Sequence, residues 1–157
     1  VKMQFSNKKY SLDWVLINEL AISQAPRKLS DLKTIEREGI ISILTLCAVS
    51  EVKLPEELET MFYTKRIVLP DHKYKRNMNI DEINKVLDVL SELLTSGPVL
   101  VHCVAAVERS PLICMGWLIR NKGLSLQEAL DYLMQIHPRT SPLSSQIKIL
   151  NSIKKDS

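Results

Sequence analysis

The sequence lacks the features of several large protein classes. Its three cysteines, Cys47, Cys103 and Cys114, form neither an even disulfide framework nor paired metal-ligand spacings, and its three histidines are scattered singly. This scarcity disfavours a zinc site and predicts no metal and no cofactor. No run approaches the roughly 20 apolar residues that span a bilayer, and none follows the polar first residues. We therefore expect no membrane span and a soluble, cytoplasmic protein.

The chain also lacks internal repeats, low-complexity tracts and long Pro/Gly/Ser linkers, so nothing suggests two domains. A content of 45% hydrophobic and 25% charged residues in 157 residues is typical of one globular domain, expected over residues 1–157 with its core at about 12–154. The net charge of +3 favours anionic partners but is far below that of a nucleic-acid-binding protein. We expect no nucleic acid as partner.

The order of predicted elements indicates an α/β fold. Short apolar runs predict strands at residues 14–17, 40–46, 66–69 and 98–102. Helical spacing predicts helices at 31–38, 80–94, 110–123, 126–133 and 144–153, two of them preceded by the capping boxes Asn79/Glu82 and Ser125/Glu128. Strands that alternate with helices predict a central, mostly parallel sheet of four to five strands, flanked by helices.

The candidate chemistry lies between the strand at 98–102 and the buried helix that opens at Ser110-Pro111. Residues 103–109, here called the cysteine loop, read Cys103-Val104-Ala105-Ala106-Val107-Glu108-Arg109. A loop at the carboxyl edge of a parallel sheet, at the start of a helix, offers free N–H groups and a dipole that favour a phosphate and a thiolate. Arg109 adds a planar donor fork that can grip two phosphate oxygens.

These residue types fit nucleophilic phosphate chemistry. The Cys103 thiolate can form a phosphocysteine intermediate, which splits one displacement into two, while Arg109 and the loop amides stabilise the equatorial oxygens. Ser110 has two readings. Its hydroxyl donates to the Cys103 sulfur and helps the thiolate leave, or Ser110 is a simple N-cap.

The pattern His102-Cys103-x5-Arg109-Ser110 resembles the signature of the protein tyrosine phosphatase superfamily, dual-specificity branch. The segments Gly123-Leu-Ser-Leu-Gln-Glu-Ala129 and Pro138-Arg-Thr-Ser-Pro142 also resemble that branch in order and spacing, and the resemblance covers roughly Trp14 to Leu150. It implies a dual-specificity phosphatase-like fold. The implied activity is hydrolysis of phosphate monoesters, with inhibition by phosphate, vanadate and sulfate in the loop.

The family also uses an aspartic general acid on a loop after the preceding strand, and Leu69-Pro70-Asp71 resembles that segment. Asp71 would protonate the leaving-group oxygen and then, as a carboxylate, activate water. Asp81 is the alternative, although an acidic residue in the first turn of a helix commonly serves the helix dipole alone.

Two loop residues depart from the family pattern. Ala106 stands where the family loop usually has glycine, so its Cβ is awkward where the backbone bends around phosphate. Glu108 would repel phosphate or compete for Arg109 if it pointed inward, and we expect it to point outward into solvent.

Three further residues have two readings each. His102 is expected to position the loop by hydrogen bonding rather than to act as an acid or base. Cys47 ends the predicted strand 40–46; it is either a small buried thiol or, as in some relatives, a reversible disulfide partner of the nucleophile. Cys114 is expected in the core.

The substrate prediction rests on the rim of the site. Basic residues at Lys73, Lys75, Arg76 and the pair Arg27-Lys28 predict either a basic rim or an ordinary solvated loop. No counterpart of the tyrosine-bearing recognition loop is visible, so a shallow site for phosphorylated Ser, Thr and Tyr in proteins is expected by family analogy. The alternatives are another phosphate monoester such as a phosphoinositide, a phosphate-binding scaffold without turnover, and a rhodanese-like sulfur transferase.

Overall fold

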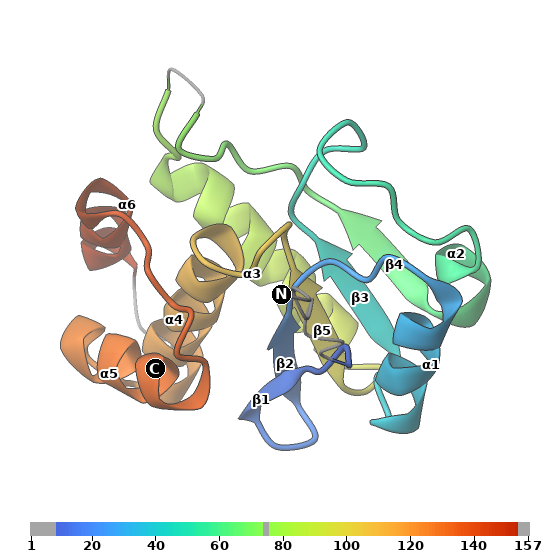
Figure 1. The fold of residues 1–157 in the computed structure, drawn as a ribbon. Coiled ribbons are helices and arrows are strands. Elements are labelled where there is room, and N and C mark those ends of the chain that lie inside the picture. The colour runs from blue at the N-terminus through green and yellow to red at the C-terminus, as the bar shows by residue number, and fades with distance from the viewer. Residues whose placement is uncertain (1–8, 74–75, 154–157) are drawn as a thin grey trace, which may run out of the picture.

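Residues 9–73 and 76–153 are described by a computed structural model, in which helices cover both faces of one sheet (Figure 1). The strands are β1 (Asp13–Leu16), β2 (Leu20–Ser23), β3 (Ser42–Thr45), β4 (Tyr63–Arg66) and β5 (Val99–His102). The helices are α1 (Leu29–Arg37), α2 (Leu58–Met61), α3 (Ile80–Leu94), α4 (Arg109–Lys122), α5 (Leu126–Ile136) and α6 (Ser144–Ile149), followed by the 3-10 turn η1 (Leu150–Ser152).

The sheet has the strand order β1-β2-β5-β3-β4. Only β1 runs antiparallel to its neighbour, and the other pairs are parallel. This confirms the predicted α/β fold with a mostly parallel sheet. Strand β5 is central, since His102 pairs in register with Ser23 of β2 on one side and Thr45 of β3 on the other. The cysteine loop therefore leaves the sheet at its middle.

The strand residues divide between two cores with a period of two, as the pleat requires. In β5, Val99 and Val101 belong to the core under α3, α4 and α5, whereas Leu100 belongs to the core under α1 and α2. Figure 1 shows these two helix groups on opposite faces of the sheet. Complete burial of such side chains stabilises the fold by about 1.5–3 kcal/mol each, which holds β5 rigid.

Local signals placed the helices that flank the site. Both predicted capping boxes are present, at Asn79/Glu82 before α3 and at Ser125/Glu128 before α5. Helix α4 is buried from Arg109 through Ile119 and ends at Gly123, whose φ of 72° is the left-handed conformation expected of a terminating glycine. The cysteine loop is thus held between a central strand and a central helix.

Other elements differ from the sequence prediction. Strand β2 and the four-residue helix α2 were not predicted, because runs of four residues carry too little periodicity. The strand expected at 66–69 lies at 63–66 instead. Because β4 is an edge strand, Tyr63 and its neighbours are largely exposed and carry no apolar pattern. The apolar residues that follow β4 therefore led to the wrong prediction. Helix α1 begins at Leu29, two residues before the predicted start, with Lys28 as its N-cap.

Candidate active site

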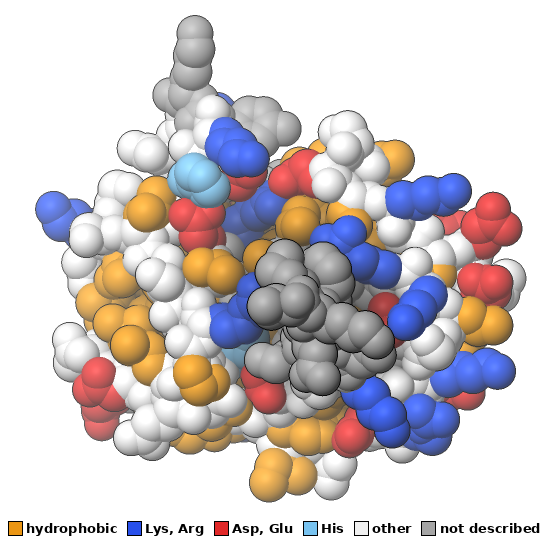
Figure 2. Space-filling model, in the orientation of Figure 1, with side chains coloured by type: hydrophobic (Ala, Val, Ile, Leu, Met, Phe, Trp, Pro, Cys, Tyr) orange, Lys and Arg blue, Asp and Glu red, His pale blue; other side chains and the backbone are white. Residues whose placement is uncertain are grey.

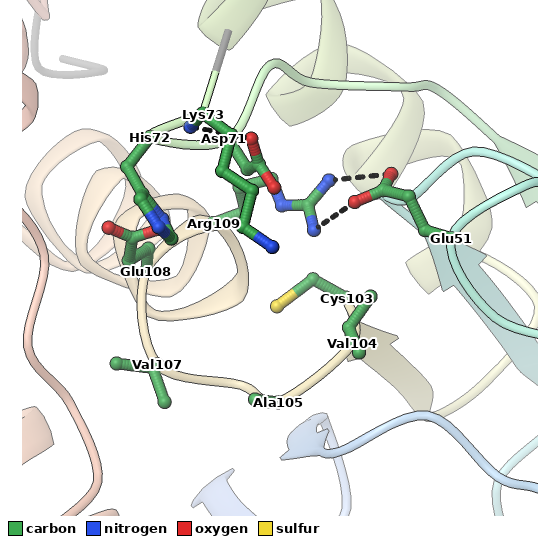
Figure 3. Close-up of a pocket in the computed structure, with 10 residues that line it drawn as sticks. All are labelled: Glu51, Asp71, His72, Lys73, Cys103, Val104, Ala105, Val107, Glu108 and Arg109. Carbon is green, nitrogen blue, oxygen red and sulfur yellow. Dashed lines mark hydrogen bonds and ion pairs between the residues drawn. The ribbon is translucent and has the colours of Figure 1, made fainter.

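A cavity of about 700 Å³ opens where β3, β4 and β5 end, at the carboxyl edge of the sheet (Figure 3). Its lining comes from the loop after β3, the loop after β4 and the cysteine loop; it consists of Glu51, Asp71, His72, Lys73, Cys103, Val104, Ala105, Val107, Glu108 and Arg109. The parallel topology therefore brings together the residues that the sequence predicted as nucleophile, phosphate clamp and general acid.

The cysteine loop has its carbonyl groups tied outward. In the middle of the loop, residues 104–107, three carbonyl oxygens accept hydrogen bonds from distant parts of the chain: Val104 from Ala25 N–H (3.0 Å), Ala106 from His137 Nε2 (2.6 Å) and Val107 from Ser141 N–H (2.8 Å). Because the C=O and N–H of a trans peptide point in opposite directions, the N–H groups that follow these carbonyls turn inward. Inward N–H groups at the start of a helix form an anion site.

Arg109 is bound along one edge of its guanidinium group. Its Nη1 donates to Glu51 Oε2 (3.0 Å) and to the carbonyl of Leu69 (3.1 Å), and its Nη2 donates to Glu51 Oε1 (2.8 Å). Within the described part of the chain, Nε and the second hydrogen of Nη2 have no hydrogen-bond partner. A guanidinium offers five N–H groups in a fixed plane, so the opposite edge stays available for two phosphate oxygens.

The Arg109–Glu51 pair is nearly buried, with 5% and 16% of the two side chains exposed. Burial alone would raise the pKa of Glu51, but hydrogen bonds from Arg109 and from the Ala48 N–H lower it below its usual value. Burial likewise opposes the charge of Arg109, and the bond to Glu51 more than compensates, so its pKa is raised. Both groups are therefore charged, and Glu51 orients the arginine.

Cys103 lies in the loop with only 3% of its surface exposed, and its sulfur points into the space that the loop encloses (Figure 3). Ser110 is not an N-cap, so that alternative is wrong: Glu108 is the N-cap of α4 and Ser110 is its second residue. The Ser110 hydroxyl is buried and has no hydrogen-bond partner among the described residues. Its proton is thus uncommitted.

His102 is fully buried beneath the loop. Its Nδ1–H donates to the Cys103 carbonyl (2.8 Å), so its Nε2 accepts from the Thr45 hydroxyl (2.8 Å). Burial lowers the pKa of His102 to about 4, although the bond to the Cys103 carbonyl opposes this shift. A neutral histidine with both nitrogens committed is suited to position the loop.

The loop after β4 carries Asp71 to the cavity. Its Oδ1 accepts a hydrogen bond from the Lys73 N–H (2.8 Å), and Figure 3 shows its carboxylate on the same side of the cavity as Arg109. Asp81 lies in the first turn of α3 and is not among the lining residues. Of the two candidates, the structure brings only Asp71 to the cysteine.

Glu108 does not point outward into solvent, so that expectation is wrong. Its side chain is 16% exposed, lines the cavity and meets His72 Nδ1 at 2.9 Å. It does not compete for Arg109, because Glu51 holds that residue. The pair instead joins the cysteine loop to the loop that carries Asp71.

Ala106 adopts a φ of 58°, the left-handed region, and is fully buried. The backbone does bend at this position, as the comparison with glycine suggested. An L residue pays about 1–2 kcal/mol for this conformation. The loop therefore contains one strained residue.

The other two cysteines are buried. Cys47 packs with Ala25 and Val52 against Val104, beside the nucleophile, and burial raises its pKa. Cys114 lies in the core of α4, as expected, and burial raises its pKa as well. All three thiols are free.

Of the described residues in the predicted basic rim, one reaches the cavity. Lys73 lines the cavity, whereas Arg76 pairs with Glu82 and Lys75 lies outside the described residues. Arg27 and Lys28 are exposed but are not lining residues. Figure 2 shows basic and acidic side chains interspersed on this face, rather than one basic field.

Sequence reasoning missed Glu51, Thr45 and His137. A carboxylate shortly after a predicted strand end was the available signal for Glu51, whereas nothing local marks the other two. Within residues 9–73 and 76–153, no three His, Cys, Asp or Glu side chains gather in a way that could hold a metal ion. No helix in the same ranges is long and apolar enough to cross a bilayer.

Comparisons with known proteins agree with this geometry. Residues 33–156 match the family model of the dual specificity phosphatase catalytic domain. Mouse dual specificity protein phosphatase 2 is 31% identical over 114 residues, which cover 72% of this chain and 34% of that protein. The phosphatidylglycerophosphate phosphatase PTPMT2 of Arabidopsis thaliana is 23% identical over 143 residues, 90% of this chain and 63% of that protein.

Among solved structures, Tk-PTP in its active form superposes with a TM-score of 0.77 at 21% identity, covering 91% of this chain and 95% of that chain. This likeness concerns the fold. The chain spans 34% and 63% of the lengths of the two relatives above, so it corresponds to a part of each. The match to the family model extends over most of the chain, and the chain belongs to the dual specificity phosphatase catalytic domain family.

Proposed function

We propose that this chain hydrolyses phosphate monoesters without a metal ion, through a phosphocysteine intermediate. The observation that carries the proposal is the meeting of the Cys103 sulfur, the inward amides of the cysteine loop and the free edge of Arg109 in one cavity. Fixed donors around a nucleophile stabilise the charge that develops on three equatorial oxygens.

The reaction proceeds in two displacements. In the first, the Cys103 thiolate forms an S–P bond as the P–O bond of the ester breaks, and Asp71 gives its proton to the leaving oxygen. In the second, the Asp71 carboxylate takes a proton from water, the new O–P bond forms and the S–P bond breaks. The uncommitted Ser110 hydroxyl supports a hydrogen bond to the departing thiolate.

We propose phosphorylated Ser, Thr and Tyr residues of proteins as the substrate class, because the more similar relatives are named as dual specificity protein phosphatases. Phosphate, vanadate and sulfate should inhibit by occupying the cysteine loop. We also propose a cytoplasmic location, since a reducing compartment preserves the three free thiols.

A phosphorylated lipid is the second candidate substrate. The observation in its favour is the similarity over 90% of the chain to a protein named as a phosphatidylglycerophosphate phosphatase. Release of phosphate from phosphopeptides, compared with release from phosphatidylglycerophosphate and phosphoinositides in mixed micelles, separates the two classes.

The test is hydrolysis of an aryl phosphate at about pH 6, in the presence of a chelator and with vanadate as inhibitor. Cys103→Ser should abolish turnover, while Cys114→Ala, a change at a thiol in the core, serves as the matched control. Retention of activity in the Cys103→Ser protein would exclude the mechanism. Binding of tungstate without turnover would instead favour a phosphate-binding scaffold.

A further inference from the structure

We propose that His137, supported by Asp13, is a positioning residue that holds the cysteine loop in its phosphate-binding shape. The inference rests on the proposed function of this loop. Of the three outward carbonyls at residues 104–107, the one at Ala106 is bound by a side chain, while the other two are bound by backbone N–H groups. Among these three, only the Ala106 contact can be lost through a change of side chain.

The imidazole bridges two separate parts of the fold. His137 is the C-cap of α5 and is 4% exposed, and its Nε2 lies 2.6 Å from the Ala106 carbonyl. Its Nδ1 lies 2.7 Å from Oδ2 of Asp13 in β1. A carbonyl oxygen can only accept a hydrogen bond, so Nε2–H donates to Ala106 and Nδ1 faces the Asp13 carboxyl group. Asp13 thus fixes the orientation of the ring.

The hydrogen bond from His137 stabilises Ala106, the strained residue of the loop. Ala106 is held at a φ of 58°, where an alanine is strained and a glycine is not. Without the bond to His137, relaxation of Ala106 would rotate its carbonyl away and turn the next N–H, that of Val107, out of the phosphate site. The short hydrogen bond from Nε2 to the carbonyl, 2.6 Å, opposes this rotation.

Two substitutions of similar size separate the two ends of the bridge. His137→Gln places an amide N–H near the position of Nε2 and so keeps the donor to Ala106, but it loses the contact with Asp13. His137→Asn places its amide near Nδ1, keeps the contact with Asp13 and loses the donor to the loop. If His137 only ties α5 to β1, the Asn variant should keep more of the wild-type tungstate affinity than the Gln variant. If His137 positions the loop, the Gln variant should keep more of it.

The control is Tyr132→Phe. The Tyr132 hydroxyl of α5 donates to the Val15 carbonyl of β1 at 2.6 Å, so this variant removes a bond between the same two elements without touching the loop. The readouts are tungstate affinity by calorimetry and kcat/KM for an aryl phosphate, with thermal unfolding as the check on folding.

We expect His137→Asn to weaken tungstate binding and to lower kcat/KM by about 10- to 100-fold, the cost of leaving the buried Ala106 carbonyl without its hydrogen bond. His137→Gln and Tyr132→Phe should each stay within about 3-fold of the wild type, whatever their effect on melting temperature. Adding Ala106→Gly to His137→Asn should recover a large part of the loss, because glycine adopts the loop conformation without support.

Equal losses in the Asn and Gln variants, or no loss in either, would overturn the inference, and so would a failure of Ala106→Gly to rescue. If His137→Asn does not fold, the proposal fails unless the Gln variant folds and binds tungstate normally. A wild-type protein that binds tungstate but does not hydrolyse the aryl phosphate would refute the proposed function and leave the inference about His137 standing. The tungstate affinities of the Asn and Gln variants would still decide the role of His137. A wild type that binds no tungstate refutes both.

Discussion

The ion pair between Glu51 and Arg109 allows a sharp test of the site. Two roles are conceivable for a carboxylate in contact with the phosphate clamp: it orients the guanidinium, or it occupies the clamp and must be displaced by substrate. The bonds favour orientation, because Glu51 takes Nη1 and one hydrogen of Nη2 and leaves the Nε edge toward the cavity. The variant that tests this is Glu51→Gln, which keeps the shape and removes the charge.

The size of the effect follows from the contacts. Arg109 would lose the one charged partner that the described residues give it, in a nearly buried position, and would keep the carbonyls of Leu69 at 3.1 Å and Leu46 at 3.5 Å. Breaking a fully buried pair costs about 3–5 kcal/mol, and the partial exposure of Glu51 reduces this to about 2–3 kcal/mol of unfolding free energy. The two carbonyls both contact Nη1 and orient the guanidinium more loosely than the ion pair does, so tungstate affinity and kcat/KM should each fall by about 10- to 30-fold.

The assay pairs urea unfolding with tungstate calorimetry at about pH 6, where the lowered pKa of Glu51 keeps the ion pair formed. Asp88→Asn is the matched control, because Asp88 pairs with Arg120 at 2.9 Å away from the cavity and is 70% exposed. That variant should change neither readout appreciably. An increase in tungstate affinity in Glu51→Gln would show that Glu51 competes with substrate and would refute the orienting role.

Three further predictions concern the acid loop and pH. Asp71→Asn should lower kcat about 10²- to 10⁴-fold with little change in tungstate affinity, as expected for a group that transfers protons. If the variant hydrolysed a substrate with a poor leaving group as fast as the wild type does, this role would be contradicted. Glu108→Gln weakens the contact with His72 and should lower kcat by about 3-fold, with a smaller change in tungstate affinity; the effect is modest because the His72 side chain is 54% exposed. A gain in tungstate affinity without a change in kcat would instead mean that Glu108 only repels phosphate. Because the pKa of His102 falls from 6.5 to about 4 on folding, the unfolded chain binds the extra proton and stability declines as pH drops through that range, by about 2 kcal/mol between pH 7 and pH 5. Urea unfolding should show that decline flattened in His102→Asn.

Local patterns carried much of the fold prediction. The capping boxes and Gly123 mark helix ends through bonds that lie within a few residues, and both were correct. Strand β5 was correct because it is buried on both faces and reads as a continuous apolar run. Strand β4 was predicted at the wrong residues because it lies at the edge of the sheet. Its backbone hydrogen bonds to β3 determine its bounds, and its exposed side chains show no apolar run.

The site divides in the same way. The arrangement of Cys103, Arg109 and Asp71 around one cavity could be anticipated, since strand ends of a parallel sheet meet at one edge. The catalytic roles assigned to these residues stay predictions. The pairing of Glu51 with Arg109 and of His137 with Ala106 could not be anticipated, because these partners lie 58 and 31 residues apart and only tertiary packing brings them together. The direction of Glu108 was mispredicted because its partner, His72, is likewise distant in sequence.

The outward ties of the cysteine loop have a consequence for how the site forms. The donors at His137 and Ser141 follow α5, so the anion site requires a part of the chain that lies 34 to 38 residues after Cys103 (137 − 103 and 141 − 103). During synthesis or refolding, the sheet and α4 can associate first, while the carbonyls of Ala106 and Val107 still lack their outward hydrogen bonds. Binding competence should therefore appear as the last step of folding, when α5 and the segment behind it dock against β1. Cys103 would then bind and attack a phosphate only after the whole domain has folded.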